Sequence, residues 1–184
     1  MENYKKNLEI LKKNHVYSEE MEHDACGVGL IASTEGKKSR KVVEYGIEAL
    51  KAVWHRGAVD ADGKTGDGAG IHVEIPKDFF IEKIEVTGHS YDNSEICVGM
   101  IFLPRNDYAA QESCKTIVES ELTKNDFSIY GWRQVPVNPK VLGEKAFQTM
   151  PEIIQVLFKS NNPELLNKDL ERKIYETRRI IENK

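Results

Sequence analysis

The sequence predicts a domain in which α-helices and β-strands are mixed. Three observations predict it: apolar residues recur at helical spacing over 40–54, alternate with polar residues over 71–75, and form a nearly continuous run over 96–103. A helical face repeats every 3.6 residues and a strand face every 2, so the chain carries both signals. Periodicity alone does not choose the topology of the sheet.

Length and composition limit the possible classes of protein. The 184 residues fit one domain of ordinary size, and the 40% that are hydrophobic suffice for a core. The net charge of −4 and the absence of a basic stripe argue against a nucleic-acid partner or an anionic membrane surface. No stretch reaches the roughly 18 apolar residues of a membrane helix. The polar first 25 residues lack the apolar centre of a signal peptide, so we expect a cytoplasmic protein.

The first half of the chain is expected to begin with a leader over residues 1–25 that contains a short helix from Lys5 to Lys13. The folded part, 26–184, then follows. Its first elements are predicted to be a short buried strand over 28–31, a helix from Arg40 to Trp54, a glycine-rich loop over 55–70 and a half-buried strand over 71–75. Pro76 ends that strand, since proline cannot donate to a strand ladder.

The second half continues the alternation of elements. The run over 96–103 predicts a strand covered on both faces, and Asn106 can cap a helix with Cys114 and Leu122 on its inward side. Residues 127–137 are expected to be extended, and 153–158 to form another strand. Asn162-Pro163 indicates the start of a last helix, because proline at the first helical position loses no needed hydrogen bond.

Three cysteines stand far apart, at positions 26, 97 and 114. An odd number without a CxxC motif argues against a disulfide framework and against a zinc ribbon. We therefore expect three free thiols and no metal site. Cys97 lies in an apolar strand and Cys114 on the inward side of a helix, so both should be shielded.

Cys26 opens the sequence Cys-Gly-Val-Gly directly after the polar leader. If the leader is removed after Ala25, one residue carries both a thiol and a free α-amine. The amine has a pKa of about 7.7–8.0, so it can act as the base for its own thiol. The alternative is a small buried residue at the start of a strand. On spacing alone that alternative is the commoner case, since free cysteines are usually buried.

Two further segments are candidate binding elements. Arg56 follows the predicted helix, where its planar fork can reach a carboxylate, or where it can simply complete the helix C-terminus. His55 beside it is either a base or a structural helix-end residue. The segment Thr65–Gly70 can present backbone amides to a substrate, or it can be only a turn.

The order of these motifs resembles the N-terminal part of the glutamate synthase large subunit family. The resemblance rests on segments that occur in the same order as in that family: 23–29 (HDACGVG), 50–58 (LKAVWHRGA), 65–71 (TGDGAGI), 98–104 (VGMIFLP) and 130–137 (YGWRQVPV). Each segment alone is a weak signal, whereas the ordered set is specific. It extends from about His23 to the last strand and helix.

The resemblance implies a class II glutamine amidotransferase on the N-terminal-nucleophile hydrolase fold. That fold is α+β, with two stacked antiparallel sheets in a four-layer αββα arrangement, of which this chain would form the N-terminal part. Cys26 is then the nucleophile exposed by removal of 1–25. Arg56 lies beside it, and Arg56 and Gly57 help to form the glutamine pocket.

The implied reaction is hydrolysis of glutamine to glutamate and ammonia through a Cys26 thioester. In the complete family protein the ammonia aminates 2-oxoglutarate, which is ammonia assimilation by an oxidoreductase. The resemblance implies no cofactor in this chain, and FMN and an iron–sulfur cluster in the full-length protein. The implied partners are glutamine, the synthase domain and, if the electron donor is NADPH and not ferredoxin, a small NADPH-dependent flavoprotein subunit. The sequence leaves the choice between the two donors open.

Two alternatives stay open. The family's oxyanion-hole Asn-Gly pair and its aspartate for the substrate amine are expected beyond Lys184, so the chain is expected to be truncated, and a non-catalytic fragment is one alternative. The other is a class II amidotransferase of purine, asparagine or glucosamine synthesis. The segments 65–70 and 130–137 argue against that second alternative.

Overall fold

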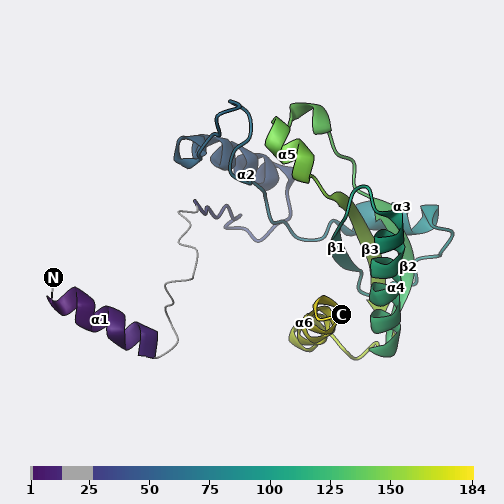
Figure 1. The fold of residues 1–184 in the computed structure, drawn as a ribbon. Coiled ribbons are helices and arrows are strands. Elements are labelled where there is room, and N and C mark those ends of the chain that lie inside the picture. Colours follow the sequence, from purple (N-terminus) through teal and green to yellow (C-terminus); the bar gives the residue numbers. More distant parts are fainter. Residues whose placement is uncertain (1, 14–26) are drawn as a thin grey trace. The chain divides into compact units, whose positions relative to one another are not determined.

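The computed structural model describes residues 2–13 and 27–184, with Arg56 described by its backbone alone. These residues divide into two compact units, Met1–Ala58 and Val59–Lys184. The elements of the first unit are α1 (Glu2–Lys13), α2 (Arg40–Ala52) and the 3-10 helix η1 (Trp54–Arg56). Those of the second, drawn in teal to yellow in Figure 1, are α3 (Lys77–Val86), β1 (Cys97–Leu103), α4 (Tyr108–Lys124), β2 (Phe127–Gln134), η2 (Pro139–Val141), α5 (Glu144–Thr149), β3 (Glu152–Ser160) and α6 (Asn167–Glu182).

In the first unit, two predicted helices are present. The helix expected from Lys5 to Lys13 is confirmed within α1. The helix expected from Arg40 is confirmed as α2, and the Ser39 hydroxyl caps it by accepting a hydrogen bond from the Lys41 N–H at 3.2 Å. It ends at Ala52, two residues before the predicted end, where η1 takes over.

Two predicted strands are wrong. Residues 28–31 and 71–75 belong to no described strand, and their apolar side chains are exposed, with Val28 at 95% and Ile71 at 46% of full exposure. A strand exists only when a neighbour accepts and donates its backbone hydrogen bonds. None of the three described strands pairs with either segment, so apolar alternation alone does not produce a strand here.

The second unit is built on a three-stranded antiparallel sheet with the order β1-β3-β2. Cys97 of β1 lies opposite Phe158 of β3, and Phe127 of β2 lies opposite Ser160. The predicted strands over 96–103 and 153–158 are thus confirmed, as is the α+β class. The segment expected to be extended over 127–137 forms a strand as far as Gln134. β3 is central, which explains why residues 154–158 are buried without interruption.

Each face of the sheet has its own apolar core. Val156 and Phe158 of β3 pack with Val118 and Leu122 of α4 and with Leu170 of α6. Between them in sequence, Leu157 points to the opposite face, since strand side chains alternate. There it packs with Phe80 and Ile84 of α3 and with Tyr130 of β2. Helix α3, which the sequence patterns did not predict, therefore provides the cover of the second face.

The cover of this second face is incomplete. We expected the strand over 96–103 to be buried on both sides, and this is wrong: Met100 is 49% exposed and Phe102 63% exposed. The register places them opposite Gln155 and Ile153 of β3. Helix α3 packs only near Val98, so the far end of β1, an edge strand, stays open.

Two helix starts also differ from their predicted positions. Helix α4 is capped by the Asp107 carboxylate, which accepts the Ala110 N–H at 2.9 Å, and not by Asn106. Helix α6 begins at Asn167 and not at Asn162-Pro163. Asn162 instead closes a turn by accepting the Glu164 N–H at 2.9 Å, which delays the helix by one turn.

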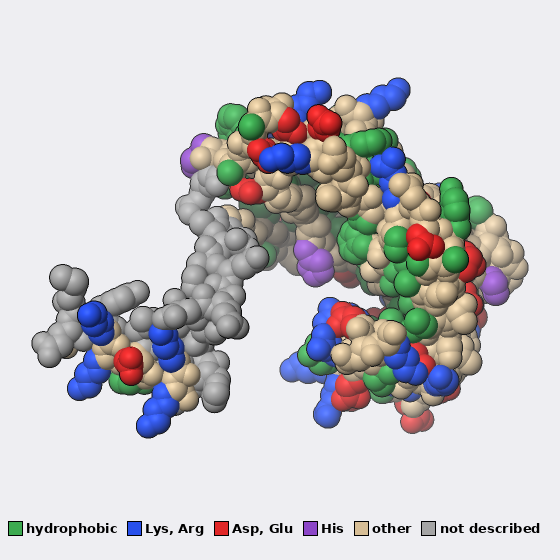
Figure 2. Space-filling model, in the orientation of Figure 1, with side chains coloured by type: hydrophobic (Ala, Val, Ile, Leu, Met, Phe, Trp, Pro, Cys, Tyr) green, Lys and Arg blue, Asp and Glu red, His purple; other side chains and the backbone are tan. Residues whose placement is uncertain are grey.

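The surface of α6 mixes charges of both signs (Figure 2). Arg172 pairs with Glu176 at 2.9 Å and Arg178 with Glu182 at 3.4 Å, one helical turn apart. Among the helices of the described residues, none is long and apolar enough to cross a bilayer.

Candidate functional site

The predicted nucleophile, Cys26, lies outside the described residues. The other two cysteines are described, and their surroundings can be compared with what a reactive thiol needs. Cys97 is 4% exposed, and burial, together with the charges of Glu95 and Glu171, raises the pKa of its thiol to about 12. A thiol with that pKa stays protonated at neutral pH, so it is no nucleophile.

The expected shielding is confirmed for Cys97. Cys114 on α4 is only partly covered, because the buried stripe of α4 is centred on Gln111, Val118 and Leu122. The described residues thus contain one buried thiol with a raised pKa and one half-buried thiol.

Arg56 and Gly57, the predicted substrate-binding residues, lie together at the end of η1. The Gly57 N–H donates to the Trp54 carbonyl at 2.9 Å and closes this short helix. Gly57 has φ −82° and ψ 148°, an extended conformation that any residue can adopt. A left-handed helix-ending conformation is therefore not the reason for a glycine at this position.

His55 has a structural role. Its Nδ1 lies 3.0 Å from the Ala52 carbonyl, and because a carbonyl can only accept, Nδ1 carries the proton. The ring thus satisfies one of the last carbonyls of α2. The contact expected of a helix-end histidine is thus observed.

In the second unit, residues 59–66 form a closed loop. Val59 and Gly66 form an antiparallel bridge, and the Asp60 N–H donates to the Thr65 carbonyl at 2.7 Å. Gly63 adopts φ +71°, the left-handed conformation that favours glycine at the tip of such a turn. The sequence GDGAG that follows is neither helix nor strand.

Asp62 is the centre of this loop. One carboxylate oxygen accepts the N–H groups of Lys64 and Thr65, at 2.9 and 2.7 Å, and the other accepts the Thr65 hydroxyl at 2.5 Å. The Thr65 hydroxyl and these backbone donors hold the pKa of the Asp62 carboxyl well below its usual range. The amides of Lys64 and Thr65 are thus bonded inside the loop, so they do not form a substrate-binding cradle.

The same loop is tied to α5, about 80 residues later in the chain. Lys145 pairs with Asp60 at 2.6 Å, and the backbone N–H of Glu144 is a further donor to Asp62. Gly143 is buried directly before α5, and a Cβ added there would lie 2.5 Å from the Thr65 backbone nitrogen. Sequence reasoning missed this contact, because nothing in a local pattern pairs residues so far apart.

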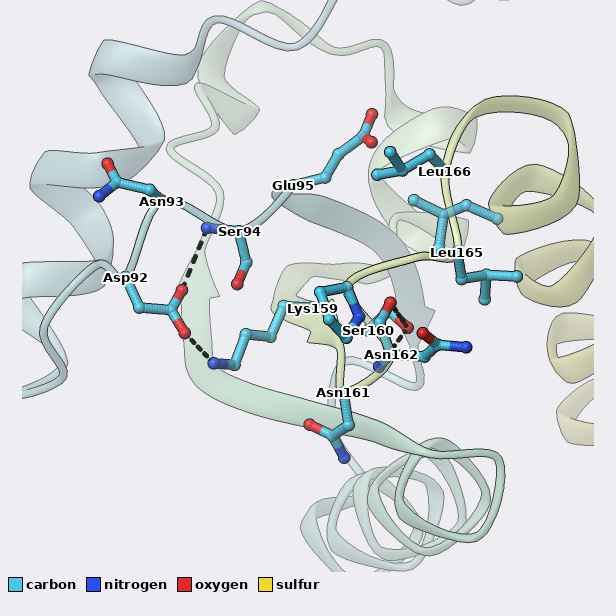
Figure 3. A pocket seen from close by; sticks show the side chains of 12 residues that line it. Asp92, Asn93, Ser94, Glu95, Lys159, Ser160, Asn161, Asn162, Leu165 and Leu166 are labelled. Carbon is cyan, nitrogen blue, oxygen red and sulfur yellow. Dashed lines mark hydrogen bonds and ion pairs between the residues drawn. The ribbon is translucent and has the colours of Figure 1, made fainter.

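A pocket of about 440 Å³ lies elsewhere in this unit, between the turn before β1 and the turn after β3 (Figure 3). One side of it is polar and the other is formed by leucines. Its lining includes Asp92, Asn93, Ser94, Glu95, Lys159, Leu165, Leu166 and Leu170. Figure 3 shows Lys159 reaching across to the Asp92 carboxylate.

The Asp92 carboxylate binds several of the polar groups at this pocket. It accepts the Tyr130 hydroxyl at 2.8 Å and pairs with Lys159, whose ammonium also lies 5.7 Å from the Tyr130 ring centre. Lys159, then Ser94 and Tyr130, hold the pKa of the Asp92 carboxyl well below its usual range. Burial, reinforced by the hydrogen bond to Asp92, raises the pKa of the Tyr130 hydroxyl.

These shifts describe a stable ion pair and not a reactive site. The carboxylate stays charged, the hydroxyl keeps its proton, and the ammonium is neutralised by Asp92. The pocket lining contains no thiol and no histidine. A sequence signal for this network is Lys159, a cation that directly follows the mostly apolar run over 153–158.

Within the described part of the chain, no three His, Cys, Asp or Glu side chains come together as metal ligands would.

Comparison with known proteins identifies a family that matches most of this chain. The family described as glutamine amidotransferases class-II matches residues 26–184, so the match begins at the predicted nucleophile. The chain is 52% identical over 179 residues to the glutamate synthase [NADPH] large chain of Azospirillum brasilense. It is 39% identical over 175 residues to the chloroplastic ferredoxin-dependent glutamate synthase 2 of Arabidopsis thaliana.

The two alignments cover most of this chain and little of the relatives. They include 97% and 94% of the residues here, but 12% and 11% of the relatives. A ferredoxin-dependent glutamate synthase 2 of Synechocystis shows the same imbalance, with 38% identity over 89% of this chain and 10% of its own length. The chain thus spans about a tenth of the length of these curated relatives.

Proposed function

The chain belongs to the class-II glutamine amidotransferases, and we propose that it is the glutaminase region of a glutamate synthase, with Cys26 as the nucleophile. The observation that supports this most directly is a family match that begins at residue 26 and continues to residue 184. The names of the relatives point to glutamate synthase among the activities served by this family.

The remaining cysteines support the choice of Cys26. The pKa of Cys97 is raised to about 12 in the core, and Cys114 lies half-buried on α4. A nucleophilic thiol needs a nearby base or a lowered pKa. Cys26 would obtain its base from its own α-amine once residues 1–25 are removed.

The proposed reaction proceeds in two steps. The α-amine of Cys26 takes the thiol proton, and the thiolate attacks the side-chain carbonyl carbon of glutamine. The tetrahedral intermediate collapses, the carbon–nitrogen bond breaks, and the amine returns the proton to the departing ammonia. Water then attacks the γ-glutamyl thioester, releasing glutamate and restoring the thiol.

Arg56 and Gly57 are proposed to bind the glutamine. The guanidinium would pair with the substrate carboxylate through two parallel hydrogen bonds. Gly57 would allow the close approach of substrate, since its extended backbone gives no other reason for a glycine. The α+β arrangement with its antiparallel sheet is compatible with one half of a four-layer αββα fold, which we propose for the complete domain.

In the complete protein the ammonia is proposed to aminate 2-oxoglutarate at a separate synthase domain. FMN and an iron–sulfur cluster would be held in that domain, as the resemblance to the glutamate synthases implies. A small NADPH-dependent flavoprotein subunit is the partner we propose, since the relative with 52% identity is an NADPH-type large chain.

The test is glutamine hydrolysis by the complete protein that contains this segment. We expect Cys26→Ala to abolish glutamate release from glutamine, while Cys114→Ala, a matched loss of one thiol, leaves the rate within about twofold. Intact-mass measurement of the same samples shows whether the mature chain begins at Cys26. Glutamine hydrolysis that persists in Cys26→Ala would rule out the proposed nucleophile.

A further inference from the structure

We propose that the open part of the sheet face beside β1 docks a polypeptide segment that brings an Asp or Glu carboxylate to Arg133. This docking face is defined by Met100, Phe102, Arg133 and Gln155, with Phe79 of α3 at its border. All five residues belong to the second unit. The segment comes from the complete protein, outside residues 1–184, and its docking does not depend on the glutaminase chemistry.

The strand register brings these side chains to one face. Met100 of β1 lies opposite Gln155 of β3, and Gln155 lies opposite Arg133 of β2. Residues that lie directly opposite each other in an antiparallel pair share a face of the sheet. Phe102 follows Met100 by two residues, so its side chain is on the same face. This is also the face on which Leu157, two residues after Gln155, packs against α3.

The described residues leave the apolar side chains of the docking face uncovered. Met100 is 49% exposed and Phe102 is 63% exposed, whereas Val156 and Phe158, on the opposite face, are buried beneath α4 and α6. Isolated exposed apolar residues are common, but these two are neighbours on one face of an edge strand. Covering them with another apolar surface is favourable, because it removes their area from water.

Arg133 gives the docking face its charge. Its Nη1 donates to the Gln155 Oε1 at 2.7 Å, and its guanidinium carbon lies 5.1 Å from the centre of the Phe79 ring. Gln155 is buried, so it is a fixed acceptor that holds the guanidinium in place. Arg133 is half-buried, and among the described side chains no carboxylate forms an ion pair with it. A partly desolvated charge of this kind is stabilised when an opposite charge reaches it.

The chemistry of the docking face selects its partner. A guanidinium has five N–H donors, and with one of them directed to Gln155 it keeps a planar fork that matches the two oxygens of a carboxylate. Methionine, arginine and aromatic side chains are the types enriched where proteins meet. A small free carboxylate would satisfy the charge but would leave Met100 and Phe102 in water. The face therefore fits a polypeptide with apolar side chains beside an acidic one.

The source of the segment follows from the size of the relatives. This chain aligns with 12% and 11% of the length of the two glutamate synthases from Azospirillum and Arabidopsis. In a complete protein of that size, segments joined to this chain by short flexible linkers reach an effective concentration on the order of millimolar. They occupy an open face ahead of a separate molecule at lower concentration. The occupant is therefore a segment of the same polypeptide.

The experiment captures this segment in the complete protein. Phe102 is replaced by the photoreactive residue benzoylphenylalanine, and peptide mass mapping after irradiation identifies what lies against it. We expect a cross-link to a peptide outside residues 1–184 that contains Asp or Glu. The matched control places the same photoreactive residue at Tyr108, which is 77% exposed and begins α4, the helix on the opposite face. The control should give no cross-link to that peptide.

A second set of variants tests the charge. Arg133→Glu should lose the cross-link from position 102, and replacing the acidic residue of the captured peptide by lysine in the same protein should restore it. Arg172→Glu reverses the charge of an exposed arginine on α6 and should leave the cross-link intact. Should Arg133→Glu fail to fold, as its melting curve would show, Arg133→Gln removes the charge at similar length and should reduce the yield.

Four results would overturn the proposal. They are a cross-link from position 102 to residues within 1–184, a cross-link between two copies in mixed isotope-labelled and unlabelled protein, no cross-link at all, and a yield that neither Arg133→Glu nor Arg133→Gln reduces. Cys26→Ala, which tests the proposed nucleophile, should leave the cross-link unchanged. The docking of the segment and the glutaminase function can therefore fail independently of each other.

Discussion

The hydroxyl of Tyr130 donates a 2.8 Å hydrogen bond to the carboxylate of Asp92, 38 residues earlier in the chain. Tyr130 is 4% exposed and belongs to the apolar core between the sheet and α3, whereas Asp92 lies at the rim of the pocket. The bond fixes the turn before β1 to β2, which is not the strand paired with β1. It therefore joins the turn before β1 to β2, two parts of the sheet region that no backbone pairing between strands connects directly.

Tyr130→Phe is expected to destabilise the protein by about 0.5–1.5 kcal/mol, the usual net contribution of one buried hydrogen bond. The phenyl ring keeps the packing with Leu157, so the loss reflects the hydroxyl alone. Urea unfolding monitored by circular dichroism gives the difference. Tyr108→Phe, at a residue that is 77% exposed, is the matched control and should change the stability little. Equal stabilities of Tyr130→Phe and the parent would show that the bond contributes nothing.

Asp92 predicts how this stability depends on pH. Its folded-state pKa is lowered by Lys159, Ser94 and Tyr130, so the charged form is the one that folding favours. The contribution is fully present above the unfolded pKa of about 3.9 and is lost as pH falls below it toward the folded value. The melting-temperature difference between the parent and Asp92→Asn should thus be larger at pH 6 than at pH 3. A difference that grows toward pH 3 would contradict the assignment.

Reactivity of the three thiols is expected to differ sharply. A glutamine-analogue electrophile such as a diazo ketone should label Cys26 in the complete protein, as peptide mass mapping would show. Cys97 should stay unlabelled in the native state at pH 7–8, because its thiol is buried and its pKa is raised to about 12. In denaturant it should react with iodoacetamide, which provides the positive control. Native labelling of Cys97 or Cys114 ahead of Cys26 would refute the assignment of the nucleophile.

Arg56→Lys tests whether Arg56 binds substrate or only ends a helix. Lysine keeps the charge but loses the planar fork that pairs with a carboxylate in two bonds. We expect glutamine-dependent activity to fall by about tenfold or more, on the order of one charge-assisted hydrogen bond, while ammonia-dependent activity is retained. The measurement is the ratio of the two rates, with the melting temperature recorded alongside. If both rates fall in step and the melting temperature drops, Arg56 is structural.

Some elements were predictable because their causes are local. Helix α2 follows from apolar residues at helical spacing. The candidate residues Cys26, Arg56 and Gly57 were identified from motifs that occur in the same order as in the family. Their roles remain predictions. The sequence did not reveal two contacts between distant residues. Gly143 contacts Asp62, 81 residues earlier in the chain, and Lys159 contacts Asp92, 67 residues earlier.

The sequence by itself determined that helices and strands are mixed in this chain, which segments form the longer helices, and which family its ordered motifs resemble. The period of the apolar residues is sufficient for the first two, and the order of the motifs for the third. Only the tertiary structure decided which apolar segments become strands. Residues 153–158 lie between two partners, whereas 71–75, equally regular in sequence, have none among the described strands. The physical reason is that a strand takes its backbone hydrogen bonds from other segments, while a helix makes its own.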